Sequence, residues 1–237
     1  IVYPAVDQNV ALTLEKGCWT KTEAFASNRG WHAENRQASD NRFEVFFGDY
    51  SYGVLQWSLL GEHNVNNALA AIAAAHHVGV APEIAMKALS SFKGVKRRFE
   101  THVRNEKFVY IDDYAHHPTE INAVHQAVRE LYPNQKVLAV FQPHLFSRTR
   151  DFADGFAASL DLLDACWLLD IYPAREQPIE GVTSAWLLSK MKMEDKQVMT
   201  KQEVLEQVKN RQPEVLLTLG AGDVDSLIGP LEDILKN

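Results

Sequence analysis

The chain has 237 residues, of which 46% are hydrophobic and 23% are charged. This is ordinary globular composition, and the length suggests one or two domains. The formal net charge of −7 gives no support for nucleic acid or an anionic membrane as a partner. Cys18 and Cys166 stand far apart and outside any Cys-x-x-Cys arrangement, so neither a disulfide framework nor a zinc ribbon is indicated, and a reducing cytoplasm fits best.

No stretch of about 18 apolar residues occurs, so the sequence predicts no membrane-spanning helix. The opening residues Ile1–Pro4 lack the basic start and the long apolar core of a signal peptide. They read instead as part of a strand, from which we expect that the chain is a piece of a longer protein.

The first part of the chain, up to about residue 60, has a strand-like pattern. Phe43–Phe47 and Val54–Leu59 flank a Gly-Asp turn and read as a hairpin. Two helices are expected to follow. The first, over Asn66–His77, is rich in alanine and ends before a glycine, and Pro82 opens the second.

Beyond about residue 101 the pattern alternates between short apolar runs and helical periodicity. This alternation predicts an α/β fold with a Rossmann-like, doubly wound parallel sheet, in which ligands bind at the carboxyl ends of the strands. We therefore expect two domains, residues 1–100 and residues 101–237. The predicted strands of the second are Phe108–Ile111, Val137–Phe141, Cys166–Ile171, Val198–Met199 and Val215–Leu219.

A dense polar block follows the first of these runs. Asp112 and Asp113 close the strand, and Pro118 suits the first turn of the next helix. Asp113 could accept hydrogen bonds from a ribose, and His116 or His117 could orient a substrate or take a proton near pH 7. The alternative is that Asp112 and His117 only cap the helix. Adjacent histidines lack the i, i+4 spacing of helical zinc ligands, which disfavours a zinc site.

A second polar block repeats this arrangement one strand later. His144, Arg148 and Arg150 follow the strand Val137–Phe141, and cations that converge on a strand end favour a carboxylate or phosphate ligand. Gly220–Asp223 follows the last strand; its glycines could admit a ligand close to the backbone or could simply form a turn.

Two further sets of residues could contact a nucleotide. Asn64 and Asn67, three residues apart near a helix start, would share one face and offer amide groups to a base, although, taken alone, they fit helix capping better. Arg97 and Arg98, in the basic connection between the predicted domains, could bind a phosphate or could be a solvated linker.

The sequence also lacks the Gly-rich loop that binds phosphate in many ATP-using proteins. No Gly-rich loop ends in Lys and Ser or Thr, so a chain that otherwise suits ATP has no phosphate cradle. A dehydrogenase would need Gly-x-Gly-x-x-Gly after a strand, and the candidate at Gly220 comes last and lacks the third glycine. A non-catalytic binding module remains the alternative from another class.

Taken together, these motifs resemble the Mur ligase family of peptidoglycan synthesis, and the resemblance runs from about residue 60 to the end. The C-terminal part is similar to the members that add L-alanine. The first part, through Gly17–Trp19 and Trp57–Asn64, is similar to the members that attach a recycled tripeptide. The motifs that carry the resemblance are Lys93–Glu100, Asp112–Glu120, Phe141–Arg150 and Gly220–Asp223.

The resemblance implies a cytoplasmic, ATP-dependent ligase. ATP would phosphorylate the carboxylate of UDP-N-acetylmuramate, and the amine of L-alanine, or of a tripeptide, would attack the acyl phosphate. Residues 1–100 would be the later part of a P-loop-type α/β central domain, and residues 101–237 the C-terminal substrate-binding domain. The P-loop and most ligands of Mg²⁺ would precede this chain, so the chain alone is expected to be inactive.

By the same resemblance, roles can be assigned residue by residue. One departure is Leu145, which stands after His144 where many relatives carry arginine, so the carboxylate contact of that arginine would be either absent or supplied by Arg148 or Arg150. The implied ATP-binding residues are His63, Asn64, Asn67, Arg98 and Asp113. The implied catalytic residues are His116, His144 and Arg148, and the implied substrate-binding residues are Tyr114, His117 and Arg150.

Overall fold

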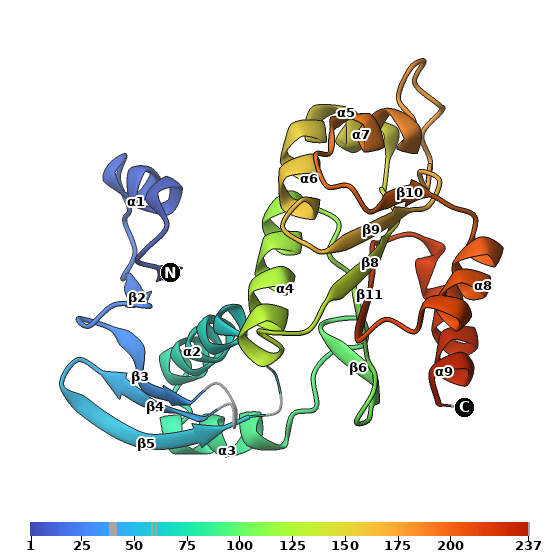
Figure 1. Cartoon of the computed structure of the whole chain (residues 1–237). Coiled ribbons are helices and arrows are strands. Elements are labelled where there is room, and N and C mark those ends of the chain that lie inside the picture. The colour runs from blue at the N-terminus through green and yellow to red at the C-terminus, as the bar shows by residue number, and fades with distance from the viewer. Residues whose placement is uncertain (38–41, 58, 60, 237) are drawn as a thin grey trace. The chain divides into compact units, whose positions relative to one another are not determined.

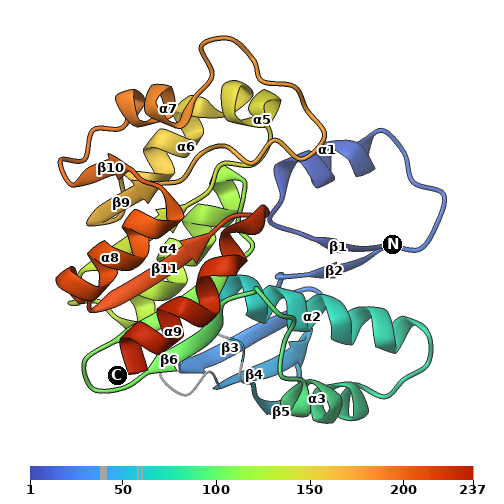
Figure 2. The same cartoon turned by 90° about the vertical axis from the view of Figure 1, so that its right-hand side faces the viewer.

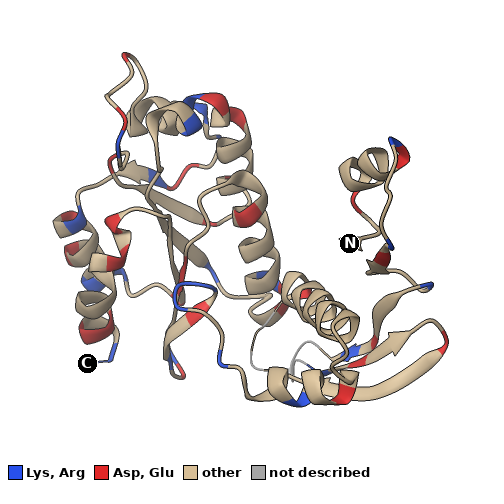
Figure 3. Ribbon diagram, turned by 180° about the vertical axis from the view of Figure 1, so that it is seen from behind, with Lys and Arg blue, Asp and Glu red and all other residues tan. Residues whose placement is uncertain are grey.

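The computed structural model describes residues 1–37, 42–57, 59 and 61–236. It divides the chain into two compact units, Ile1–Gly94 and Val95–Asn237, and the division falls inside the basic connection Lys93–Arg98. Figure 3 shows acidic and basic segments spread over the elements of both units. No helix in the described part of the chain has the length and apolar character needed to cross a membrane.

The first unit contains one five-stranded sheet in the order β1-β2-β3-β4-β5. β1, β2 and β3 pair in parallel, and β3, β4 and β5 are antiparallel. Its helices are α1 (Gln8–Glu15), α2 (Glu62–His77) and α3 (Pro82–Ser91). Its strands are β1 (Val2–Pro4), β2 (Glu23–Phe25), β3 (Trp31–Gln37), β4 (Arg42–Phe47) and β5 (Tyr50–Gln56).

The predicted hairpin of this unit is confirmed as β4 and β5, which pair in register at Phe47 and Tyr50. The turn needs only two residues, because Gly48 adopts a left-handed φ of 54°. The second strand therefore begins earlier than predicted and ends at Gln56; of the residues predicted beyond it, Ser58 lies outside the described residues. Helix α1 was not predicted; it is eight residues long, and none of its side chains is fully buried.

Helix α2 begins at Glu62, four residues before the predicted start. Asn64 and Asn67 therefore lie inside the helix, and the N-cap position is Gly61, which has no side-chain cap. The capping interpretation of the asparagines is wrong. The predicted shared face is confirmed, since Asn67 Nδ2 donates to Asn64 Oδ1 at 3.3 Å.

The second unit contains a six-stranded sheet in the order β10-β9-β8-β11-β7-β6. All neighbours pair in parallel except β6, which is antiparallel to β7. The edge strand β6 was not predicted, because it reads Glu-Thr-His-Val-Arg and buries only Val103. The strands are β6 (Glu100–Arg104), β7 (Val109–Asp113), β8 (Val137–Phe141), β9 (Ala165–Leu168), β10 (Lys196–Val198) and β11 (Val215–Leu219).

Helices cover both faces of this sheet, which confirms the doubly wound prediction. Figures 1 and 2 show α4, α6 and α7 on one face and α8 and α9 on the other. Strands covered on both sides can be apolar throughout, and every residue of β8 and β11 is buried. The helices are α4 (Pro118–Leu131), α5 (Phe146–Asp151), α6 (Ala153–Leu160), α7 (Ser184–Lys190), α8 (Lys201–Arg211) and α9 (Ile228–Lys236), with a 3₁₀ turn η1 (Asp223–Leu227) before α9.

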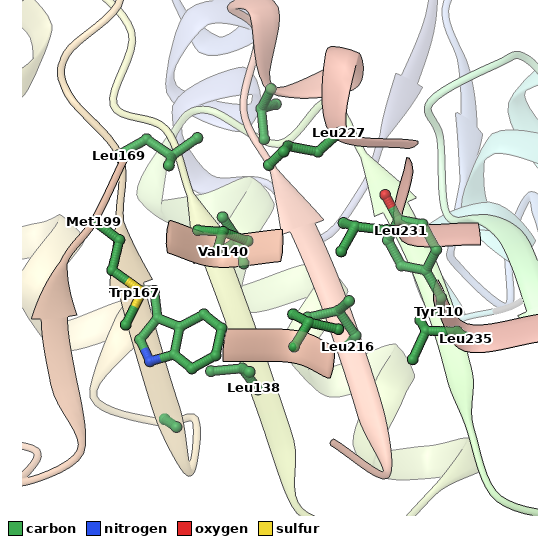
Figure 4. Close-up of a cluster of buried hydrophobic side chains, with 14 of the residues drawn as sticks. Tyr110, Leu138, Val140, Trp167, Leu169, Met199, Leu216, Leu227, Leu231 and Leu235 are labelled. Atoms are coloured by element: carbon green, nitrogen blue, oxygen red, sulfur yellow. The ribbon is translucent and has the colours of Figure 1, made fainter. Parts of the chain in front are cut away.

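The core between the sheet and helices α8 and α9 holds the strands in place. Tyr110, Leu138 and Leu216 from three strands pack with Leu231 and Leu235 of α9 (Figure 4). Each fully buried aliphatic side chain of this kind contributes about 1.5–3 kcal/mol relative to exposure. The strand ends above this core are therefore rigid supports for the polar segments that follow them.

Candidate functional site

The register of the sheet brings three polar segments to one edge. Leu219 of β11 lies opposite Asp113 of β7 on one side and Phe141 of β8 on the other. Because the three strands are parallel, their carboxyl ends meet at the same edge of the sheet. The segments Tyr114–His117, Gln142–Arg148 and Gly220–Asp223 therefore leave the sheet at the same level, and we call them the strand-end segments.

Asp112 is fully buried and is held from two sides. Its Oδ1 accepts a hydrogen bond from the Thr218 hydroxyl at 2.6 Å, and its Oδ2 accepts one from Arg97 Nε at 3.0 Å. A buried carboxylate needs such partners. Asp112 does not cap helix α4, so that interpretation is wrong for Asp112. His117 is the N-cap residue, and its Nδ1 accepts from the Thr119 backbone N–H at 3.3 Å.

Asp113 is also buried, with 5% of its surface exposed. Its two oxygens accept hydrogen bonds from the backbone N–H groups of Phe99 and Ala115, both at 2.7 Å. Burial raises the pKa of Asp113 to about 6, and these two hydrogen bonds lower it only in part. The carboxylate therefore ties the segment before β6 to the end of β7.

The two arginines of the basic connection differ in environment. Arg97 is largely buried, with 16% of its side chain exposed, and pairs with Asp112, so the solvated-linker interpretation is wrong for Arg97. Arg98 is half-exposed; its guanidinium lies over the Tyr114 ring at 5.4 Å and 3.9 Å from Glu120 Oε1. Arg98 is thus the arginine left accessible to a ligand.

The two predicted catalytic histidines come together, although their strands are not neighbours in the sheet. The rings of His116 and His144 are 5.9 Å apart in an edge-to-face arrangement. His116 Nδ1 lies 2.9 Å from the Tyr114 carbonyl oxygen and 3.2 Å from Glu120 Oε2. These contacts fix the orientation of the His116 ring.

Three buried polar atoms of the second block have no hydrogen-bond partner within the described part of the chain: Gln142 Oε1, His144 Nδ1 and Arg148 Nη1. Buried polar atoms of this kind are rare in folded proteins and indicate a missing partner. Burial, assisted by the charge of Arg148, holds the pKa of His144 below its usual 6.5. His144 is therefore neutral at pH 7 and can accept a proton.

Three other residues of the two polar blocks make separate contacts. Arg150 Nε donates to its neighbour Asp151 at 2.8 Å, and half of its side chain is exposed. Leu145 adopts a left-handed φ of 70°, and its N–H donates to the Tyr172 carbonyl at 2.9 Å. His117 packs edge-on against Phe152, with ring centroids 4.6 Å apart.

Sequence reasoning did not assign a role to several residues of this region. The Tyr172 ring stacks on His144 at 5.7 Å. Glu176 accepts hydrogen bonds from the backbone N–H of Ser147, at 2.9 Å, and from its hydroxyl. Gln142 Nε2 donates to Asp223 Oδ1 at 2.7 Å. The available signal was the polar run Asp170–Glu176 after β9, which has the same position relative to its strand as the two polar blocks.

The predicted nucleotide residues fall in both units. His63, Asn64 and Asn67 lie on α2 of the first unit, and Arg98 and Asp113 lie in the second. Asn64 is buried, with 8% exposed. In the described ranges no three His, Cys, Asp or Glu side chains are grouped so as to hold a metal ion.

Comparison with known proteins shows which family contains these segments. The family described as "Mur ligase, glutamate ligase domain" matches residues 97–222, which include the first two strand-end segments and Gly220–Gly222 of the third. The chain belongs to the Mur ligase family. A relative in Flavobacterium psychrophilum, named UDP-N-acetylmuramate–L-alanine ligase, is 60% identical over 174 residues, which are 73% of this chain and 39% of that protein.

Two solved Mur ligases resemble the whole of this Mur ligase chain. A UDP-N-acetylmuramate-alanine ligase of Thermotoga maritima is 26% identical, with a TM-score of 0.70, over 99% of this chain and 50% of that one. A murein peptide ligase of Psychrobacter arcticus is 28% identical, with a TM-score of 0.70, over 100% of this chain and 51% of that one. The chain thus spans about half the length, or less, of these proteins.

Proposed function

We propose that this chain is part of an ATP-dependent ligase that joins L-alanine to UDP-N-acetylmuramate through an acyl-phosphate intermediate. The observation that carries the proposal is a set of three buried atoms, one each in Gln142, His144 and Arg148, that have no hydrogen-bond partner among the residues that the structure describes. An amino acid has an amine that donates and a carboxylate that accepts, and this set offers the matching acceptor, base and cation. The name of the Flavobacterium psychrophilum relative supports L-alanine as that amino acid.

Arg148, His144 and His116 have separate chemical roles in the proposal. Arg148 Nη1 binds the carboxylate of L-alanine, in place of the arginine that Leu145 replaces. His144 is neutral because its pKa is lowered, so it accepts a proton as the amine attacks. His116, held at Glu120 and Tyr114 beside His144, orients the reacting groups.

Nucleotide contacts are proposed for each unit by itself. In the first unit, Asn64 and Asn67 present a hydrogen-bonded amide pair on α2, next to His63. In the second, Arg98 offers a half-exposed guanidinium for a phosphate, and Asp113 orders the backbone beside it. ATP, when bound, supplies the phosphoryl group that activates the muramate carboxylate, and Mg²⁺ is proposed, from the family resemblance, to be held mostly by residues outside this chain.

The remaining assignments complete this proposal. Tyr114, His117 and Arg150 are proposed to contact the substrates. Residues 1–100 are proposed to be the later part of a central ATPase domain, and residues 101–237 a substrate-binding domain. The ligase is proposed to act in the cytoplasm, where nucleotide-linked precursors are made.

A second candidate donor is the tripeptide that some family members attach. It rests on the motifs Gly17–Trp19 and Trp57–Asn64, because the Psychrobacter arcticus murein peptide ligase matches the chain with the same TM-score as the alanine ligase, 0.70, and so does not distinguish the two donors. A tripeptide also has an α-amine, so Gln142 and His144 could contact the amine of either donor, L-alanine or the tripeptide. The resemblance of the first part to this branch is kept as a proposal.

The test uses a joined protein, in which this chain follows the N-terminal part of the Flavobacterium psychrophilum relative. Phosphate release from ATP with UDP-N-acetylmuramate should depend on L-alanine, and this chain alone should release none. Arg148→Met should abolish the L-alanine dependence, whereas Arg211→Met, which removes an exposed ion pair with Asp195, should retain it.

Three outcomes contradict the proposal. Faster turnover with the tripeptide than with L-alanine assigns the second candidate. L-Alanine-dependent release by this chain alone contradicts its being part of an active site. A joined protein that binds ATP and L-alanine in calorimetric titration without turnover, while the relative itself is active, indicates a non-catalytic binding module.

A further inference from the structure

The side chain of Arg97 connects three parts of the second unit that are far apart in sequence. Its Nε donates to Asp112 Oδ2 of β7 at 3.0 Å. Its Nη2 donates to the Gly220 carbonyl at 2.7 Å, and its Nη1 donates to the Gly222 carbonyl at 3.4 Å and lies 3.6 Å from Asp225 Oδ2. One guanidinium therefore bridges the segment before β6, the end of β7 and the turn after β11.

The backbone around Arg97 is held in a costly conformation. Arg97 and Phe99 both have left-handed φ angles, 61° and 51°, which non-glycine residues rarely adopt. Such conformations persist where the surroundings fix them. Here the Arg97 carbonyl accepts from the Tyr114 N–H at 2.7 Å, its N–H donates to Glu100 Oε2 at 2.8 Å, and Phe99 N–H donates to Asp113.

The Gly220–Gly222 turn, whose carbonyl groups Arg97 contacts, also packs tightly against Gln142 and Tyr172. A Cβ atom placed on Gly220 would lie 2.7 Å from the Gln142 carbonyl oxygen. One placed on Gly222 would lie 2.4 Å from Gln142 Oε1 and 2.7 Å from Tyr172 Cβ. Tyr172 in turn stacks on His144. The Gly220–Gly222 turn is thus wedged between Arg97 and the residues that support His144.

The charge and shape of arginine both matter in this position. Asp112 has no exposed surface, so its charge needs a cationic partner. Lysine could supply the charge, but its single ammonium group cannot reach Asp112 and the two glycine carbonyls at once, as the planar guanidinium of Arg97 does. The contacts with the turn, beyond the ion pair, therefore require arginine.

We propose that Arg97 is a positioning residue for the strand-end segments. Its guanidinium fixes the Gly220–Gly222 turn, and through this turn it fixes Gln142 and the Tyr172–His144 stack. Its effect on amine-donor binding rests on the proposed function, whereas its effect on the turn does not.

The first experiment measures amide hydrogen exchange in this chain. Arg97→Lys should raise exchange at the Gly220 amide, which donates to the Asp113 carbonyl, and at the Tyr114 amide by at least tenfold. Amides of β9 and α7 should be unchanged. The matched control Arg211→Met, which also removes an arginine–aspartate pair, should leave Gly220 and Tyr114 as in the unmodified chain. Unchanged exchange at Gly220 in Arg97→Lys overturns the proposal.

A second variant separates the loss of the Arg97 hydrogen bonds to the turn from the loss of the charge that pairs with Asp112. Arg97→Met alone leaves Asp112 unpaired and is expected to unfold easily, so Arg97→Met is combined with Asp112→Asn, which removes both charges. This double variant should fold with the same far-UV spectrum as the unmodified chain and still show fast exchange at Gly220. Normal protection of Gly220 in the folded double variant overturns the proposal.

The joined protein supplies the functional readout. Arg97→Lys and the double variant should raise the KM for L-alanine at least tenfold while the KM for ATP changes less than twofold. Unchanged KM for L-alanine in the folded double variant overturns the positioning role. If the unmodified joined protein is inactive, the proposed function has failed, and the exchange result still decides whether Arg97 fixes the turn.

Discussion

Replacement of Asp113 by asparagine should change the pH dependence of stability in a defined direction. Burial raises the pKa of Asp113 in the folded chain to about 6, from an ordinary value of 3.8. The folded state therefore binds the proton more tightly than the unfolded state. This group destabilises the fold fully above pH 6, and the destabilisation is relieved as pH falls towards 3.8. In Asp113→Asn this pH-dependent destabilisation is absent.

The size of the effect follows from the pKa difference. Each pKa unit corresponds to about 1.4 kcal/mol, so the full effect is about 3 kcal/mol, and roughly half of it falls between pH 5 and pH 8. Asparagine has one oxygen for the N–H groups of Phe99 and Ala115, which adds a pH-independent loss of about 1–3 kcal/mol. The stability advantage of the unmodified chain over Asp113→Asn should therefore shrink as pH rises.

Urea unfolding of both proteins from pH 4.5 to 8 measures this advantage, and the ¹³Cγ chemical shift of Asp113 reports its pKa directly. Asp195→Asn is the control. The hydrogen bond from Arg211 holds the pKa of Asp195 below its ordinary value of 3.8, so the advantage over that variant should stay nearly constant from pH 4.5 to 8 and should be lost only as pH falls below 3.8. The reasoning is refuted if the free energy of unfolding of the unmodified chain, relative to that of Asp113→Asn, stays constant or grows as pH rises. It is also refuted if the ¹³Cγ shift of Asp113 titrates below pH 4.5.

Two further predictions concern the same strand ends. Gly220→Ala should destabilise the second unit by about 2 kcal/mol or more in urea unfolding, because its Cβ would meet backbone oxygen at 2.7 Å and its φ is 139°. Gly229→Ala, at a helical glycine with open space around it, should be neutral or stabilising by up to about 1 kcal/mol; equal effects of the two changes would contradict the packing argument. In NMR titrations, Arg148→Met should raise the pKa of His144 towards 6.5, because the charge of Arg148 helps to lower it, whereas Arg211→Met should not; an unaltered His144 titration in Arg148→Met means that Arg148 does not act on this ring.

Local sequence patterns were sufficient to predict most of the second unit. Val137–Phe141 and Val215–Leu219 are continuous apolar runs, and a strand covered on both faces has no polar alternation to obscure its bounds. The prediction failed where burial was partial. Strand β6 lies at the sheet edge and buries only Val103, and helix α1 is short and has no fully buried side chain, so neither was recognised.

The sequence by itself determined the chemistry of the strand ends: two carboxylates, paired histidines and clustered arginines after buried strands. Only the tertiary structure decided which of these groups meet. Strand β11 inserts between β7 and β8, and this insertion places the Gly220–Gly222 turn against Gln142 and beneath the fork of Arg97. Arg97 and Gly220 are separated by 123 positions, and no local pattern encodes a contact that depends on the order of strands in a sheet.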